Sequence, residues 1–102
     1  MNRVVILLNT KDDVATALTA LKAGQKVNAE LETTTYTTEL VEDIDFFHKY
    51  ALRNVAKGED ILKYGLPIGT ALADIAEGEW VHVHNCRSEH YGFHRKQYGL
   101  KA

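Results

Sequence analysis

Hydrophobic residues in this chain fall into short runs that polar segments interrupt. Residues 4–8 form a continuous apolar run rich in β-branched side chains, and residues 9–13 follow as a polar turn. Such a run is typical of a short buried strand. Residues 31–40 alternate and are dense in threonine, which predicts a strand with one exposed face. Because no long segment keeps a good helical period, the pattern predicts an all-β domain and argues against helical crossovers between parallel strands.

A second pattern marks a strand–turn–strand unit that the chain uses more than once. It reads A-L-x-x-h-x-x-G-x-x-h, where h is an aliphatic residue. Its copies start at Ala17, Ala51 and Ala71, and their glycines are Gly24, Gly58 and Gly78. A glycine suits such a turn because a positive φ brings a Cβ into collision. The distance between copies varies, so the pattern predicts a reused turn and excludes a solenoid.

A degenerate fourth copy follows when the pattern is laid over residues 40–50. Ile44 takes the aliphatic position and Phe47 takes the glycine position. His48 and Lys49 come next, so this turn is expected to carry two ionisable side chains.

The segment from 61 to 85 holds the densest set of turn signals. We expect a strand at 61–64, a turn at 65–69 and a strand at 80–84. Residues 88–102 lose all periodicity, and we expect a tail there that is mobile or docked on a partner. The predicted organisation is therefore one domain at 1–87 followed by that tail.

Composition and charge narrow the function classes. The chain has 102 residues and a net charge of −2, which argues against a general nucleic-acid binder with a basic face. No apolar run approaches membrane-spanning length. Cys86 has no second cysteine to pair with, so an internal disulfide is excluded and the reducing cytoplasm is the expected compartment.

Two segments resemble a known enzyme family. Residues 62–69 read LKYGLPIG and residues 81–85 read VHVHN. They are similar to the N-terminal domain of the altronate and galactarate dehydratases and to the small subunit of sulfolactate sulfo-lyase. Residues 12–15 (DDVA) and 44–52 (IDFFHKYAL) fit the same family pattern. The resemblance covers about residues 4–87.

The resemblance implies a small SAF-type β-clip domain that precedes, or lies beside, a much larger lyase part. That large part binds most of the substrate and is associated with an iron requirement. Because the sequence stops soon after VHVHN, we expect a small subunit that acts with a separate large lyase subunit and is inactive alone. The expected reaction is dehydration of an altronate-like sugar acid to a 2-keto-3-deoxy acid. Two alternatives stay open: the small subunit of a sulfolactate sulfo-lyase, and a SAF-type binding or assembly module without catalysis. The isolated chain is expected to self-associate.

His48 and Lys49 are the candidate catalytic pair. Removing water from a hydroxy acid needs a proton acceptor, a proton donor and a cation that holds the carboxylate, and a His-Lys pair on a turn supplies such groups. The alternative is two solvated surface residues. Phe47 and Asp45 stand where the family pattern has glycine and proline. An aromatic residue takes a positive φ only at a cost, so the turn is expected to change its shape or direction.

His82 and His84 are the candidate metal ligands, because residues two apart on a strand share a face. The metal, iron(II) or another divalent ion, is expected to be bound mainly by the large subunit. Lys63 and Asn85 are the candidate substrate-binding residues. The alternative for each is a structural role at an exposed strand. Tyr64 and Trp80 are expected in the core or at an interface.

Overall fold

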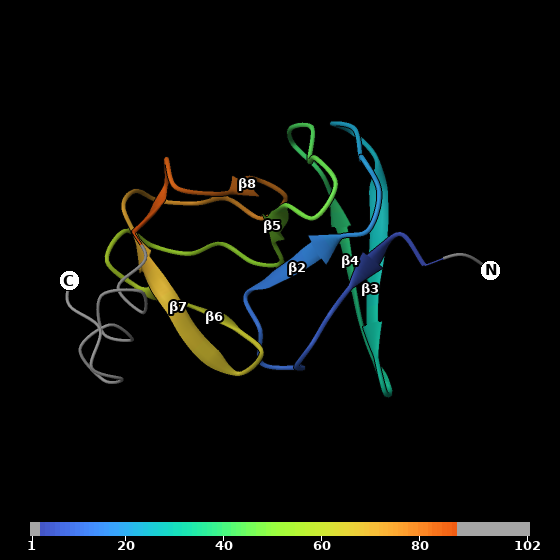
Figure 1. Cartoon of the computed structure of the whole chain (residues 1–102), viewed down its shortest axis with the longest axis horizontal. Coiled ribbons are helices and arrows are strands. Elements are labelled where there is room, and N and C mark those ends of the chain that lie inside the picture. Colours follow the sequence, from blue (N-terminus) through green and yellow to red (C-terminus); the bar gives the residue numbers. More distant parts are fainter. Residues whose placement is uncertain (1–2, 88–102) are drawn as a thin grey trace.

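The computed structural model describes residues 3–87, and the predicted tail at 88–102 lies outside them. Within the described residues the chain is all β, as predicted, with nine strands and no helix (Figure 1). The strands are β1 (Val5–Ile6), β2 (Val14–Ala17), β3 (Lys26–Leu31), β4 (Thr34–Glu39), β5 (Lys49–Ala51), β6 (Asp60–Lys63), β7 (Leu66–Ala71), β8 (Trp80–Val81) and β9 (Cys86–Arg87).

Three antiparallel sheets make up the domain. The central sheet has the order β1-β2-β5-β8, the hairpin β3-β4 forms the second sheet, and the third has the order β6-β7-β9. Figure 1 shows the β3-β4 hairpin and the β6-β7 hairpin on opposite sides of the central strands.

The central sheet separates two hydrophobic clusters because alternate residues of a strand point to opposite faces. Ala15 and Tyr50 belong to the cluster that includes residues of β3. Their neighbours Val14 and Ala51 belong to the other cluster, which includes residues of β6 and β7. Lys49 shares a face with Ala51, so its side chain lies on the side of the third sheet.

The glycine turns form as the repeat predicts. Gly24, Gly58 and Gly78 have φ values of 86°, 91° and 89°. Phe47 has a φ of 67° and follows the same turn, so the expectation that this turn would change its shape is wrong. The four turns also pair with one another, Leu21 with Ile44 and Val55 with Ile75, through isolated antiparallel bridges. These reciprocal backbone hydrogen bonds hold the fourth turn in the glycine geometry.

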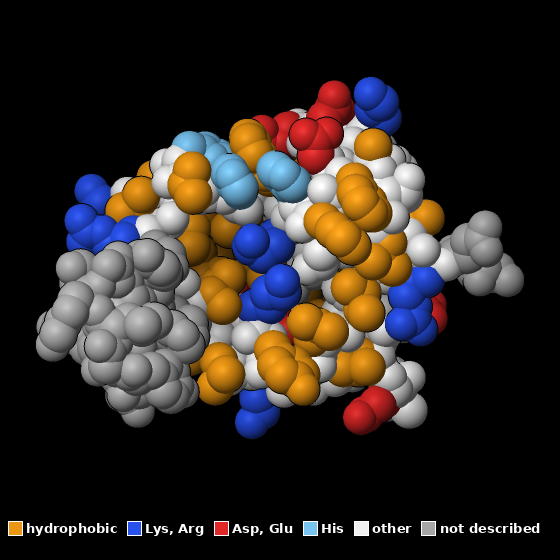
Figure 2. All heavy atoms as spheres, in the orientation of Figure 1, with side chains coloured by type: hydrophobic (Ala, Val, Ile, Leu, Met, Phe, Trp, Pro, Cys, Tyr) orange, Lys and Arg blue, Asp and Glu red, His pale blue; other side chains and the backbone are white. Residues whose placement is uncertain are grey.

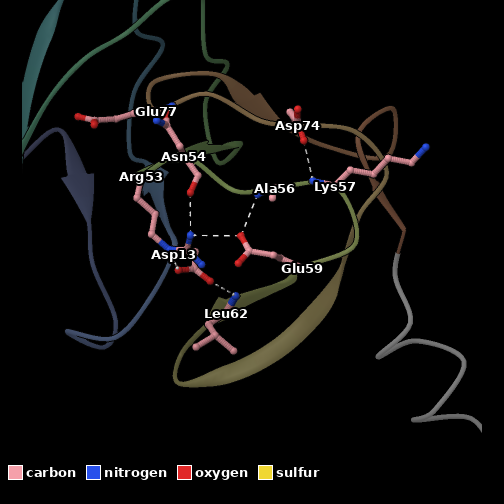
Figure 3. A network of polar contacts seen from close by, with 9 residues as sticks. All are labelled: Asp13, Arg53, Asn54, Ala56, Lys57, Glu59, Leu62, Asp74 and Glu77. Carbon is pink, nitrogen blue, oxygen red and sulfur yellow. Dashed lines mark hydrogen bonds and ion pairs between the residues drawn. The ribbon is translucent and has the colours of Figure 1, made fainter.

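Polar side chains just before the aliphatic position tie paired turns together. Asn54 accepts a hydrogen bond from the backbone N–H of Glu77 at 2.8 Å, and Asp74 accepts one from Lys57 at 2.9 Å (Figure 3). Asp43 does the same for the turn of the first copy. Each contact satisfies a turn N–H that the sheets leave unpaired.

The turn predicted at 65–69 is wrong in its position. The reversal lies at Tyr64 and Gly65, with φ values of 58° and 76°, and β7 begins at once after it. Position 69 lies inside β7, and it requires glycine because a Cβ there would collide with the carbonyl oxygen of Arg87 in the adjacent β9. Pro67 is accommodated next to a bulge opposite Ile61. Gly65 therefore belongs to the turn, whereas Gly69 marks close packing of two strands and Pro67 lies next to a bulge.

Two further strands differ from their predictions. Residues 31–40 contain the reversal between β3 and β4, at the two residues after Leu31. The strand predicted at 80–84 ends at Val81, and the chain turns through residues 82–85. The N–H groups of Asn85 and Cys86 both donate to the carbonyl oxygen of His82, which closes this turn.

Two buried carboxylates fix the β6-β7 hairpin to the loop before β2. Asp12 accepts hydrogen bonds from the backbone N–H groups of Tyr64 and Gly65, both at 2.8 Å. Asp13 accepts one from Leu62 at 2.8 Å and one from Nε of Arg53 at 2.6 Å (Figure 3). The acidic residues of the DDVA segment thus act as structural clamps.

Candidate functional site

The histidines of the described chain gather along one edge of a single face. Figure 2 shows them at the top of this face, with lysine or arginine side chains below them and hydrophobic side chains around both groups. The three histidines within residues 3–87 come from the turn before β5 and from the turn after β8.

Trp80 lies at the centre of these rings. Its indole ring lies 4.7 Å from the ring of His84, 5.1 Å from His82 and 5.6 Å from His48, measured between centroids. The rings of His48 and His82 stack at 4.8 Å. The structure therefore brings the predicted catalytic and metal-ligating histidines into one aromatic cluster.

A hydrogen bond orders this cluster. Nε1–H of Trp80 donates to Nδ1 of His48 at 2.9 Å. The backbone N–H of Trp80 donates to the carboxylate of Glu42 at 3.0 Å, which holds the start of β8. His48 is half-buried, and its second nitrogen, Nε2, is not used by this bond.

Asn85 is buried and holds the turn that carries the other two histidines. Its side-chain oxygen accepts a hydrogen bond from the backbone N–H of His82 at 2.9 Å. Its Nδ2 donates to the carbonyl oxygen of Trp80 at 2.8 Å. Both ends of the side-chain amide are thus engaged with backbone, which places Asn85 in the support of the site.

Lys49 extends from β5 toward the third sheet. Burial lowers the pKa of its ammonium, and the charge of Lys63 lowers it further, while Cys86 opposes this shift. The positive charges of Lys49 and Lys63 repel each other and both side chains are half-buried, so an anionic ligand beside them would be favoured. Burial raises the pKa of the Cys86 thiol, which keeps it protonated and weakly nucleophilic.

Exposed apolar side chains adjoin these histidines and lysines in the sequence. Phe46 and Phe47 stack at 4.0 Å between centroids and are 55% and 62% exposed. Val83, between the two histidines of the second turn, is 76% exposed. Tyr64 is 68% exposed, which excludes the core position of the two expected for it and leaves the interface as a prediction.

The sequence is similar to that of a known protein family. Residues 3–89 match the family described as the altronate/galactarate dehydratase SAF domain. This chain belongs to that SAF domain family.

Curated relatives of the SAF domain fall into two groups. Altronate dehydratase of Escherichia coli K12 is 47% identical over 83 residues, which are 81% of this chain and 16% of that protein. Altronate dehydratase of Bacillus subtilis 168 is 36% identical over the same length. The alpha subunit of (2R)-sulfolactate sulfo-lyase of Chromohalobacter salexigens is 33% identical over 73 residues, which are 70% of this chain and 78% of that protein. The chain thus spans about a sixth of the altronate dehydratases, at 16%, but most of the sulfo-lyase subunit.

The described residues of the SAF domain do not by themselves complete a metal site. No group of three or more His, Cys, Asp or Glu side chains within residues 3–87 is placed to hold a metal ion. His82 and His84 flank Trp80 on a turn, and their role as metal ligands stays a prediction. Residues 3–87 also contain no helix of the length and hydrophobicity that crossing a bilayer requires.

Sequence reasoning missed two parts of the site. It places Trp80 in the core or at an interface, and the indole does pack against the first hydrophobic cluster, but the sequence did not show that it also contacts three histidines. It gives Phe46 no role. The signal for both is present, because aromatic residues directly flank the His-Lys and His-x-His pairs in the sequence.

Proposed function

We propose that this SAF domain is the small component of a hydro-lyase that dehydrates an altronate-like sugar acid to a 2-keto-3-deoxy acid. It acts with a much larger lyase body, which we propose to be a separate subunit. The observation that carries this proposal is the 47% identity to an altronate dehydratase across 83 residues. A match of that length includes the His48-Lys49 turn and Trp80.

The lysine pair suits the substrate class. A sugar acid carries a carboxylate, and loss of its α-proton places more negative charge on the carboxylate oxygens. Lys49 and Lys63 offer two positive charges that can hold the carboxylate of the substrate. Burial and the charge of Lys63 lower the pKa of Lys49, which favours release of its proton and makes its amine a candidate proton acceptor.

The apolar rim supports docking of a lyase body on this face. Phe46, Phe47 and Val83 expose most of their side chains beside the histidines, and exposed apolar side chains of this kind favour a protein contact. Two relatives are named as alpha subunits, which implies a further subunit in those proteins. Closing the face would bury the lysines and strengthen their attraction for an anion.

We propose that the lyase body binds the divalent metal, which is iron(II) or another divalent ion. Metal ions of this kind polarise an oxygen of the substrate and help hydroxide to leave. His82 and His84 are candidates for completing that ligand set, and Lys63 is the candidate for holding the carboxylate.

A domain exchange tests the proposal in the body of a relative that is named an altronate dehydratase. Residues 3–87 replace the matched segment of the E. coli protein, and altronate dehydration by the chimera is compared with that of the parent and of the parent without the segment. We expect the chimera to dehydrate altronate and the truncated parent to be inactive. A folded chimera with no turnover would count against the hydro-lyase assignment.

A sulfo-lyase is the second candidate because this chain covers 78% of the length of a sulfolactate sulfo-lyase subunit. That reaction would release sulfite in place of water. To separate the two candidates, residues 3–87 replace the matched segment in the alpha subunit of the C. salexigens enzyme, and the release of sulfite is measured. Activity in neither background, with both chimeras folded, would favour a SAF-type module that binds without catalysis.

A further inference from the structure

The hydrogen bond between Trp80 and His48 determines which proton His48 carries. An indole N–H is a donor only, so its partner nitrogen has to offer a lone pair. Nε1–H of Trp80 lies 2.9 Å from Nδ1 of His48. Nδ1 is therefore without a proton, and the neutral ring carries its proton on Nε2.

We propose that Trp80 is a positioning residue that holds His48 as the neutral Nε2–H tautomer, so that His48 donates a hydrogen bond to a substrate oxygen and does not act as the base. The role of His48 toward a substrate oxygen rests on the proposed function, whereas the tautomer of His48 does not.

The groups around His48 agree with this assignment. A proton on Nδ1 would set two donors, that N–H and the indole N–H of Trp80, against each other. The ring of His82 stacks on the ring of His48 and offers Nδ1 no other hydrogen bond among those that the described residues make. His84 lies on Trp80 and adds a further titratable ring. Glu42 is the nearby carboxylate, and it accepts the backbone N–H of Trp80.

The tautomer restricts the chemistry of His48. With Nδ1 occupied and Nε2 protonated, the ring has no free lone pair with which to take the α-proton. Its Nε2–H is instead suited to an oxygen that gains negative charge when that proton leaves, a role in which a neutral imidazole is effective. The base is then a different group, either Lys49 or a residue of the lyase body.

Side-chain ¹⁵N NMR of the 11.5 kDa chain reads the tautomer directly. In the unsubstituted chain at neutral pH we expect a pyridine-type shift for Nδ1 of His48 and a pyrrole-type shift for Nε2. In Trp80→Phe the two shifts should move toward each other as the other tautomer becomes populated. His84→Ala is the matched control, because it removes a ring from Trp80 but leaves the donor, and it should keep the shifts of His48.

The unsubstituted spectrum alone can overturn the inference, whether or not Trp80→Phe folds. A pyrrole-type Nδ1, or an imidazolium at neutral pH, would contradict it. This readout needs no turnover, so a failure here is distinct from a failure of the hydro-lyase assignment.

The active chimera gives the second test. Glutamine keeps an N–H donor but cannot exchange protons, so His48→Gln should retain at least about tenfold more kcat than His48→Ala, the equivalent of about 1.4 kcal/mol. Equal losses in both variants would show that His48 transfers protons or acts only structurally.

Discussion

The backbone N–H of Phe47 donates to the carbonyl oxygen of Ala17 at 2.8 Å. The same bond runs from Gly58 to Ala71 and from Gly78 to Ala51, in each case from the left-handed residue of one turn to the first residue of its paired copy. Phe47 therefore occupies a glycine position in full, including its hydrogen bond, and carries two costs: a left-handed backbone and an exposed aromatic ring. Neither the left-handed backbone nor the exposed ring stabilises the isolated domain, so a role of this ring in docking would explain why Phe47 stands there.

Replacing Phe47 by glycine should stabilise the isolated chain. A left-handed conformation costs a residue with a Cβ roughly 1–2 kcal/mol, and glycine avoids it at an entropic cost of roughly 0.5–1 kcal/mol. We expect Phe47→Gly to raise the free energy of unfolding by roughly 0.5–1 kcal/mol in urea titrations. Phe47→Ala keeps the strain and should bring no gain. A loss of stability in the glycine variant would contradict the strain argument.

Removing the Asp12 carboxylate should weaken the fold strongly. Its two oxygens satisfy the N–H groups of Tyr64 and Gly65, and the residue is only 5% exposed. Leaving two N–H groups unpaired costs roughly 1–3 kcal/mol each, so Asp12→Ala should lose roughly 2–6 kcal/mol. Asp45→Ala is the control, since that residue is exposed, and it should stay within about 0.5 kcal/mol of the unsubstituted chain. Similar unfolding midpoints for the two variants would refute the clamp.

Stability should fall below neutral pH in part because of His82. Burial lowers the pKa of His82, and the charges of His48, Lys49 and His84 lower it further. The unfolded chain then binds the proton at a higher pH than the folded chain. The contribution of His82 to stability is fully present above about pH 6.5, the ordinary histidine pKa. It is lost as the pH falls from there through the lower pKa of the folded state. His82→Gln should flatten the dependence of unfolding free energy on pH between about 7 and 5.5; an unchanged slope would show that His82 has no part in it.

Lys49 should be unusually reactive toward acylating reagents at mildly alkaline pH. Its lowered pKa leaves more neutral amine, and removing the neighbouring charge in Lys63→Gln should raise that pKa and slow acylation of Lys49. Peptide mass spectrometry after brief acetic anhydride treatment measures the rate. Lys57→Gln, on an exposed turn, is the matched control and should leave the rate at Lys49 unchanged.

The sequence predicted the class of fold and most of its turns because both depend on local rules. Glycine is favoured where the backbone takes a positive φ, and the repeated spacing of the glycines at 24, 58 and 78 reveals three such turns. It failed where a residue serves a distant partner. Gly69 is small because β9 passes over it, which nothing near residue 69 records.

The candidate site shows the same division. The His-Lys and His-x-His pairs are visible in the sequence, whereas their meeting around one indole depends on the pairing of β5 with β8. Trp80 and His48 are 32 residues apart, so no periodicity connects them. The end of β8 at Val81 was missed although its cause is local, because Asn85 hydrogen-bonds to the backbone of His82 and Trp80, three and five residues before it, and so favours a turn over a longer strand.

The central claim is that the face formed by the His48-Lys49 turn takes part in sugar-acid dehydration. The most direct test measures kcat/KM for altronate in the chimera with Lys49→Met, which removes the charge and keeps the length of the side chain. We expect a loss of roughly 10–100-fold, the value of one charge-assisted contact, and no change with Lys57→Met. Equal kcat/KM values for the chimera and its Lys49→Met variant would contradict the account.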